Sequence, residues 1–308
     1  MHSEKGVKTN DITLSRAVVI GGMPRSGTNL ARRIVGSHSL VAVPPAELGF
    51  YQKIASGWTI EKILTEPKFL DRYRPDVKDL VHLEGDVVYR HLLARYAASK
   101  GKSIPGEKSP LNEFFYRDIQ RCFAGCDLRF VHMVRNPFDV VASYKNAPFR
   151  GANPDNEIST LATVAADWVR SVSLATARTL MQPNSYCMVR FEDLTGDTEA
   201  VAAKLCAFLG LEFERDRMLN LSDYQGQRDN TSFTPHASGA DDESKVKQLD
   251  SRKGHLSGAE VSAVGSICGE MAQAIGYEDP DFDRAPVHLP TNTKPKSSLR
   301  WLSRKLGL

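Results

Sequence analysis

A short apolar run followed at once by a glycine-flanked turn constrains this chain more than any other segment. The run is AVVIG (Ala17–Gly21), the turn is GMPRSGTN (Gly22–Asn29), and a helical pattern follows the turn. A continuous apolar run of this length is typical of a strand buried on both faces of a parallel sheet. A turn from such a strand into a helix points backbone N–H groups and the positive end of the helix dipole at one place. The segment therefore predicts a binding site for an anion such as phosphate.

The remaining pattern alternates between strands and helices. Apolar runs predict strands over 128–134 and 186–191, and helical patterns cover 87–100, 157–180 and 198–209. Two further helices are marked by their starts: Ser109-Pro110 as N-cap and first residue of a helix over 111–123, and Ser257 with Glu260 as the capping box of a helix that Gly276 ends. This alternation predicts an α/β, P-loop-like fold of three layers, in which helices cover both faces of a mostly parallel central sheet.

The chain is expected to contain one domain with irregular ends. Residues 1–16 are expected to be a flexible N-terminus, and residues 17–280 the domain itself. Residues 281–308 are expected to form a Pro-rich linker and a basic amphipathic tail. The polar stretch over 222–253 has few large apolar residues, which predicts a long functional loop.

Composition excludes several classes of protein. The 40 Lys and Arg residues nearly balance 37 Asp and Glu, and a net charge of +3 is too small to indicate a nucleic-acid partner. Five cysteines without a CxxC pair argue against a disulfide scaffold and a zinc site. The N-terminus has no apolar core of signal-peptide length, and no run approaches the ~20 apolar residues that span a bilayer. A cytoplasmic protein is therefore expected.

The glycine-flanked turn differs from the phosphate loop of nucleoside triphosphatases. Gly22 and Gly27 have the spacing of the motif GxxxxGK[ST], but Thr28 takes the place of its Lys and Asn29 that of its Mg²⁺-binding Ser or Thr. A chain without these residues lacks the parts that cleave a β–γ phosphate bond. Arg25 instead supplies a planar cation that suits an oxyanion. The alternative is a surface turn with an incidental Arg.

A second segment predicts another anion site. In RNPFDVVAS (Arg135–Ser143), Arg135 follows a buried strand, and it would lie at the carboxyl end of the sheet, where open α/β sheets bind ligands. Ser143 lies two helical turns further on and can face the same ligand. The alternative is that Pro137 and Asp139 merely start a helix and that Ser143 is solvated. Two separate anion sites suggest a nucleotide with phosphates at both ends.

Together these segments resemble the sulfotransferases that use 3′-phosphoadenosine 5′-phosphosulfate (PAPS). PRSGTN (Pro24–Asn29) resembles their 5′-phosphosulfate loop, and RNPFDVVAS resembles their 3′-phosphate signature. The chain looks closest to the bacterial and tyrosylprotein-sulfotransferase-like branch. Supporting segments occur in the family's order over roughly residues 17–277: VPPAE (43–47), GEKSP (106–110), MVRFEDL (188–194) and SRKGHLS (251–257).

The resemblance implies a role for each matching position. The 5′-phosphosulfate would be held by Arg25, Ser26, Gly27, Thr28 and Asn29, and the 3′-phosphate by Arg135 and Ser143. The segment that would close over the nucleotide comprises Ser251, Arg252, Lys253 and Gly254. Lys108 matches the active-site lysine, Glu47 is nearest to the general base, and Arg25 with Lys108 would neutralise the leaving group. No required metal is expected.

Four positions depart from the family's pattern. Ala46 stands where the branch often writes the acidic residue, which displaces Glu47 by one position. A solvated loop residue is therefore an alternative reading of Glu47. Asn29 replaces the usual Thr or Ser, and Gly254-His255-Leu256 replaces GRW or GxW. Phe191 stands where some relatives have Tyr, which puts one nucleotide contact in doubt.

The function implied is in-line transfer of a sulfuryl group from PAPS to a hydroxyl, or an amine, of an acceptor. Carbohydrate, lipid, small metabolite and protein tyrosine all remain open as acceptors. A nucleotide-dependent phosphotransferase would explain the strand and turn but neither the missing Lys nor the second segment. A non-catalytic nucleotide-binding module is the other alternative, which the departures at Asn29 and Glu47 keep open.

The C-terminal tail suggests a further partner. In SSLRWLSRKLGL, Leu299, Leu302 and Leu306 fall at helical spacing, and basic residues occupy much of the remaining arc. This pattern predicts a short interfacial helix that contacts anionic lipids, which would place the protein at the inner face of a membrane. The alternatives are a helix packed on the domain and a disordered tail.

Overall fold

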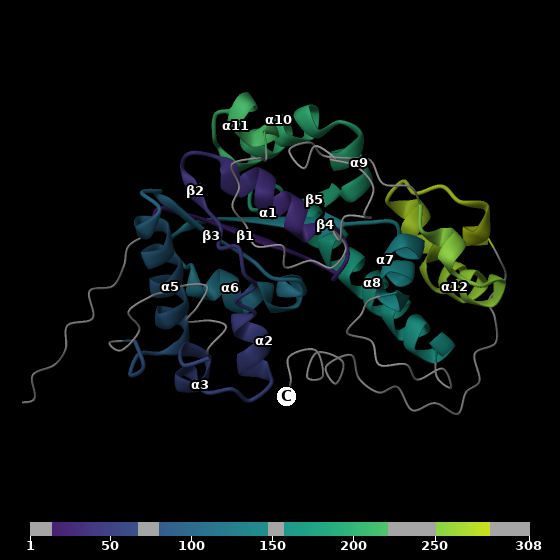
Figure 1. Cartoon of the computed structure of the whole chain (residues 1–308), viewed down its shortest axis with the longest axis horizontal. Helices are drawn as coiled ribbons and strands as arrows, with labels where there is room; N and C mark the ends of the chain where they lie inside the picture. Colours follow the sequence, from purple (N-terminus) through teal and green to yellow (C-terminus); the bar gives the residue numbers. More distant parts are fainter. Residues whose placement is uncertain (1–13, 67–79, 147–156, 221–250, 284–308) are drawn as a thin grey trace, which may run out of the picture.

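The computed structural model describes residues 14–66, 80–146, 157–220 and 251–283. Its centre is a sheet of five parallel strands in the order β2-β3-β1-β4-β5. The strands are β1 Arg16–Gly22, β2 Val41–Ala42, β3 Ile104–Lys108, β4 Asp127–Val134 and β5 Tyr186–Arg190. Helices lie on both faces of the sheet (Figure 1). The expected three-layer α/β fold is confirmed.

Each face of the sheet has its own apolar core. On one face Val18 and Ile20 of β1 pack with α1 Thr28–Ser37, α9 Phe191–Gly196, α10 Thr198–Leu209 and α11 Arg215–Leu219. On the other face Ala17 and Val19 pack with α2 Phe50–Ala55, α3 Ile60–Leu64, α5 Gly85–Ser99, α6 Tyr116–Cys122, α7 Pro137–Lys145, α8 Glu157–Met181 and α12 Gly258–Ala274. Adjacent residues of β1 thus face opposite layers, as a buried parallel strand requires.

Strands β2 and β3 were not predicted from the sequence. The β3 sequence IPGEK contains Pro, Gly and two charged residues, so it forms no apolar run, yet all five residues are buried. They are buried because β3 lies between β1 and β2 in the sheet. The side chains of Glu107 and Lys108 are therefore carried into the interior, where only a functional or structural partner can compensate for burying them.

The helix predicted over 111–123 differs in its start. Ser109 is not an N-cap, because its hydroxyl contacts Glu107 and accepts the N–H of Gly49. Leu111 has a φ of +70°, which interrupts the chain before a 3₁₀ turn, η1 Asn112–Phe115, and then α6. The remaining predicted elements are confirmed within about two residues. The capping box of Ser257 and Glu260 is present, and the other short turns are η4 Lys253–His255 and η5 Pro280–Asp283.

A buried polar network holds the end of β1. The N–H of Gly22 donates to Glu113 Oε2 at 2.8 Å, and Ser171 Oγ donates to Glu113 Oε1 at 2.7 Å. Behind them the His132 ring contacts Ser171 Oγ at 3.0 Å and the Tyr186 hydroxyl at 2.6 Å. Burial, with a smaller contribution from Arg178, lowers the pKa of His132 to about 3, so the ring is neutral. His132 is therefore an interior residue with hydrogen-bond partners.

No helix in the described ranges is long and apolar enough to cross a membrane. Three of the regions singled out in the sequence lie largely outside the described residues, which include only 14–16 of the N-terminus over 1–16, 251–253 of the polar stretch over 222–253, and 281–283 of the linker and tail over 281–308.

The close approach of β1 and β4 predicts that Gly22→Ala destabilises the protein. Gly22 has a φ of +126°, and a Cβ there would lie 2.2 Å from the backbone oxygen of Met133. We expect the free energy of unfolding to fall by more than 2 kcal/mol, about 1–3 kcal/mol of it from backbone strain alone. Urea denaturation measures this change. The matched control is Gly57→Ala, which also has a positive φ but no atom within 4 Å, so equal losses at both positions would contradict the prediction.

Candidate active site

The turn after β1 has the geometry of an anion-binding loop. It runs from the strand into α1, and the N-cap residue of α1 is Gly27, which has no side chain to cap the helix. Gly27 has a φ of +89°, and a Cβ there would lie 2.3 Å from the Phe191 ring. Ser26 is 1% exposed, and its hydroxyl has no hydrogen-bond partner among the described residues. A buried hydroxyl beside the free N–H groups of a helix start fits a phosphate-type ligand.

Arg135 is held at the end of β4, next to this loop. Its Nη2 lies 3.3 Å from Asp139 Oδ2, its Nη1 donates to the backbone oxygen of Arg25 at 3.5 Å, and its guanidinium stacks 4.4 Å from the Phe191 ring centre. Asn136 caps α7 by accepting the N–H of Phe138 at 2.9 Å. The predicted helix start after Arg135 is therefore present, and Arg135 is buried and oriented rather than solvated.

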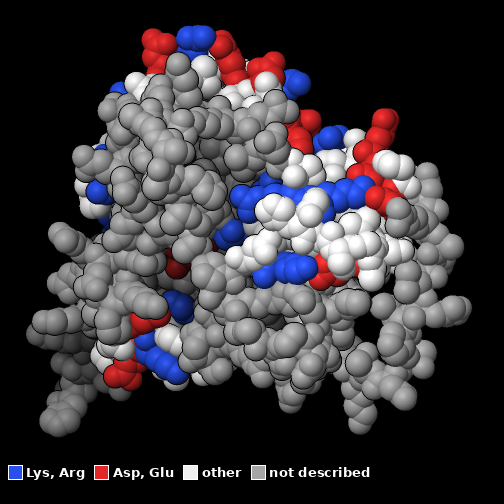
Figure 2. Space-filling model, turned by 45° about the vertical axis from the view of Figure 1, so that its right-hand side comes forward, with Lys and Arg blue, Asp and Glu red and all other residues white. Residues whose placement is uncertain are grey.

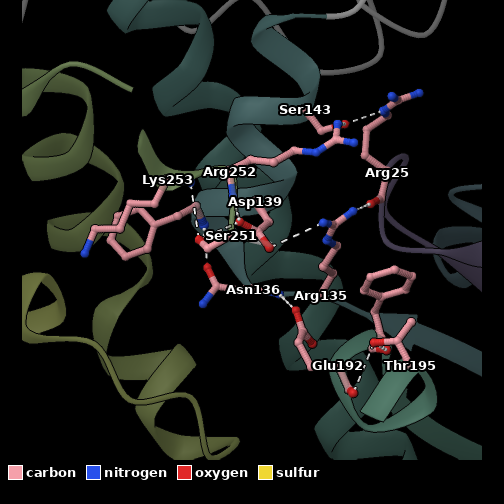
Figure 3. A network of polar contacts seen from close by, with 12 residues as sticks. Arg25, Arg135, Asn136, Asp139, Ser143, Glu192, Thr195, Ser251, Arg252 and Lys253 are labelled. Atoms are coloured by element: carbon pink, nitrogen blue, oxygen red, sulfur yellow. Dashed lines mark hydrogen bonds and ion pairs between the residues drawn. The ribbon is translucent and has the colours of Figure 1, made fainter. Parts of the chain in front are cut away.

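Ser143 joins the loop to two more of the predicted residues. Its Oγ accepts Arg25 Nε at 2.8 Å and Arg252 Nη1 at 3.2 Å (Figure 3). Three segments that lie far apart in the sequence thus meet in one cluster: residue 25, residues 135 and 143, and residue 252. Ser143 is buried on α7, which excludes the alternative of a solvated serine.

Like charges crowd this cluster. The pKa of Arg25 falls to about 10 because of burial, then because of Arg252 and Arg135, while Glu47 acts in the opposite direction. Burial and Arg135 also lower the pKa of Arg252, and Asp139 opposes them. A pKa of about 10 leaves Arg25 charged at neutral pH. Basic side chains likewise form a band across the face shown in Figure 2, with acidic side chains towards its edge. The cluster is therefore a strong attractor for a polyanion.

Asp139 connects the cluster to the segment after the long polar stretch. Its Oδ1 accepts the hydroxyl of Ser251 at 3.0 Å and the N–H of Arg252 at 2.7 Å. Lys253 instead points away from the arginines (Figure 3) and pairs with Asp279 and with Asp281, the latter at 2.5 Å. Of the four residues predicted to close over a nucleotide, Ser251 and Arg252 thus contact the cluster directly. Gly254 lies in η4, where a Cβ would meet no atom within 4 Å.

Glu47 and Lys108 form an ion pair at the carboxyl end of β3. Glu47 Oε1 lies 2.9 Å from Lys108 Nζ, and the Glu47 side chain is 42% exposed whereas that of Lys108 is 1% exposed. Burial lowers the pKa of Lys108, Glu47 opposes that effect, and Arg32 adds to it. Ala46, at the position where relatives often have the acidic residue, is buried in the core. Glu47, one position after the place where the acidic residue was expected, therefore contacts Lys108.

Sequence reasoning missed several residues that support this site. Asp139 lies inside the quoted segment RNPFDVVAS, so its spacing of four residues from Arg135 is a signal that could have revealed the pair. Glu113 carries no local signal, and Glu192 lies in the quoted segment MVRFEDL, where no role was predicted for it. Glu192 Oε1 accepts the N–H of Asn136 at 2.9 Å and thereby fixes the turn after Arg135. No group of three or more His, Cys, Asp or Glu residues in the described part of the chain could hold a metal ion.

Comparisons with known proteins identify the family. No curated protein sequence matches the chain. The sulfotransferase domain of the Synechococcus PCC 7002 olefin synthase shares its fold, with a TM-score of 0.55 and 17% identity over 88% of this chain and 98% of that one. The sulfotransferase domain from the curacin biosynthetic pathway gives a TM-score of 0.52 and 20% identity over 96% and 98%. A family model described as the sulfotransferase family matches residues 17–215, more than half of the 308 residues, and the chain therefore belongs to the sulfotransferase family.

Proposed function

We propose that the chain transfers a sulfuryl group from PAPS to a hydroxyl, or an amine, of an acceptor molecule. The observation that best supports PAPS as donor is the convergence of Arg25 and Arg252 on Ser143, with Arg135 beside them. Guanidinium groups this close repel one another, and a ligand with two separated anionic groups relieves that repulsion. PAPS carries a phosphosulfate at one end and a phosphate at the other.

The residues of the cluster fit both ends of such a donor. The buried Ser26 hydroxyl and the start of α1 suit the 5′-phosphosulfate, together with Thr28 and Asn29. Ser143 Oγ already accepts two guanidinium N–H groups, so its own hydrogen is left to donate to an anion. We assign Ser143 and Arg135 to the 3′-phosphate on this basis.

The ion pair at β3 suits the chemical step. The acceptor oxygen forms a bond to sulfur while the bond between sulfur and the 5′-phosphate oxygen breaks, and the acceptor proton passes to Glu47. Lys108 and Arg25 stabilise the charge that develops on the departing phosphate, the part that Mg²⁺ plays for triphosphates. Fixed cations of this kind act by positioning and by charge stabilisation, which dominate reactions with a loose transition state.

Radiolabelled PAPS identifies the acceptor and separates an enzyme from a binding module. The protein is incubated with this donor and host extract, and the labelled product is fractionated into carbohydrate, lipid, small-metabolite and protein classes. A non-catalytic module would bind the nucleotide and label nothing above the background of a sample without the protein.

The first prediction of this proposal concerns the choice of nucleotide. Calorimetry without added Mg²⁺ should show PAPS, or its product adenosine 3′,5′-bisphosphate (PAP), binding about 100-fold more tightly than ATP or GTP. The physical reason is that only the first two offer a 3′-phosphate to Arg135 and Ser143. Equal or tighter binding of a triphosphate would rule out PAPS as the preferred ligand.

The second prediction concerns Arg135. Arg135→Ala should weaken PAP binding by about 2–4 kcal/mol, the loss typical of a buried charge-assisted pair. Binding of adenosine 5′-phosphosulfate, which lacks the 3′-phosphate, should barely change in the same calorimetric assay. Arg121→Ala removes an arginine that pairs with Asp118 on the surface, and it serves as the control. Equal losses for both nucleotides in the Arg135 variant would show that this residue does not read the 3′-phosphate.

The third prediction concerns the ion pair. Lys108→Ala and Glu47→Gln should each lower kcat for label transfer by about 100-fold or more while PAP affinity stays near normal. Glu61→Gln, an exposed carboxyl on α3, should leave kcat unchanged. A Glu47→Gln enzyme with full activity at every pH tested would move the base to another residue.

A further inference from the structure

We propose that Glu107 and Ser109 are positioning residues that set Glu47 against Lys108. They act on the base loop, which we define as residues 44–49, the segment between β2 and α2 that carries Glu47. This inference rests on the proposed role of Glu47 as the base. It concerns the two residues that flank Lys108 in the chain.

Ser109 is attached to the base loop directly. Its Oγ accepts the N–H of Gly49 at 2.8 Å, only two residues beyond Glu47. Its hydroxyl hydrogen is directed to Glu107 Oε1 in a short contact. Because a serine hydroxyl has a single hydrogen, its donation to Glu107 leaves a lone pair for Gly49. Glu107 thus orients the Ser109 hydroxyl so that its oxygen can accept the N–H of Gly49.

Glu107 is itself anchored on several sides. Besides Ser109, its carboxylate accepts Asn112 Nδ2 in a short contact and the Tyr89 hydroxyl at 3.4 Å. Asn112 Oδ1 in turn accepts Gln52 Nε2 at 3.2 Å, and Gln52 belongs to α2, which follows the base loop. The cluster therefore holds the end of the loop at Gly49 and the helix beyond it.

The same strand end also supplies the partner of Glu47. Lys108 Nζ contacts Glu47 Oε1 at 2.9 Å, while Ser109, whose hydroxyl donates to Glu107, accepts the N–H of Gly49. Without the hydrogen bond between Gly49 and Ser109, the base loop is no longer held at a fixed distance from Lys108. Because a displacement of about 1 Å at a reacting group can cost on the order of 100-fold in rate, this attachment matters for turnover. Nucleotide binding depends on other elements, namely β1, α1, α7 and the segment from Ser251.

Two variants test the inference. Ser109→Ala removes the acceptor of the Gly49 N–H, and Glu107→Gln keeps the side-chain volume while placing an amide where three donors converge. We expect both to lower kcat for label transfer from saturating radiolabelled PAPS to the acceptor in host extract by about tenfold or more. The KM for PAPS and the Kd for PAP should stay within about twofold of the unmodified protein. Ser56→Ala is the matched control, because within the described residues this hydroxyl donates to the backbone oxygen of Gln52, at the other end of α2 from the base loop.

Hydrogen exchange measures how firmly the base loop is held, and it needs no acceptor substrate. Peptides that cover residues 44–49 should exchange about tenfold faster in Ser109→Ala than in Ser56→Ala, whereas peptides over Gly22–Asn29 should not change. An unchanged kcat, an unchanged exchange rate in the loop, or a PAPS KM that rises in proportion to the loss of kcat overturns the proposal. If Ser109→Ala no longer binds PAP, the isosteric Glu107→Gln variant decides by the same measurements.

A double-mutant cycle separates this inference from the assignment of the base. If Ser109 acts through Glu47, Ser109→Ala should cost little further activity in a Glu47→Gln background. A full further loss of about tenfold there would overturn the positioning role while leaving Glu47 as the base. A fully active Glu47→Gln enzyme would instead overturn the assignment of the base, whatever the exchange data show for the loop.

Discussion

The parallel pairing of β1 with β3 on one side and β4 on the other is the constraint on which the site depends. Its register places Ile20 beside Lys108 and Gly22 beside Met133. Because all three strands point the same way, the phosphate-type loop, Lys108 and Arg135 must emerge at one edge of the sheet. The chain order sends β2 and β3 to one side of β1 and β4 and β5 to the other. A ligand that lies across this edge therefore contacts residues from segments more than 100 positions apart.

Bringing these residues together costs electrostatic energy, and neighbouring groups reduce that cost. Burial lowers the pKa of Arg25, and repulsion by Arg252 and Arg135 adds to that effect. Asp139 offsets part of the repulsion and also ties Arg252 to α7 by its backbone N–H. Ser143 adds a neutral acceptor between two of the guanidinium groups. The resulting arrangement is held by hydrogen bonds and an ion pair, and it retains the positive charge that a site for an anionic ligand needs.

The sequence was sufficient for features that are local and failed for those that depend on distant contacts. The loop from Gly22 to Asn29 and the helix start after Arg135 are encoded within a few residues each, so both were predicted. Strand β3 was missed because its burial comes from its neighbours in the sheet and not from its own hydrophobicity. Glu113, 91 residues from its partner Gly22, could not be paired with it by any spacing rule. Ser109 does not cap a helix as expected, because its hydroxyl accepts the N–H of Gly49, 60 positions away.

The one-residue displacement of the acidic residue from position 46 to Glu47 has a physical reason in the structure. The side chain of Ala46 lies in the apolar core, 2% exposed, with Leu48 in the same cluster. A carboxylate at position 46 would be buried there among apolar side chains, which is costly without a partner. One residue later, the Glu47 side chain is partly exposed. Its Oε1 lies 2.9 Å from Nζ of Lys108, whose own side chain is buried. The contact between the Glu47 carboxylate and the Lys108 ammonium is thus set by the path of the loop. Ser109, the residue directly after β3, accepts the N–H of Gly49, so the segment that carries the lysine also contacts the loop that carries Glu47.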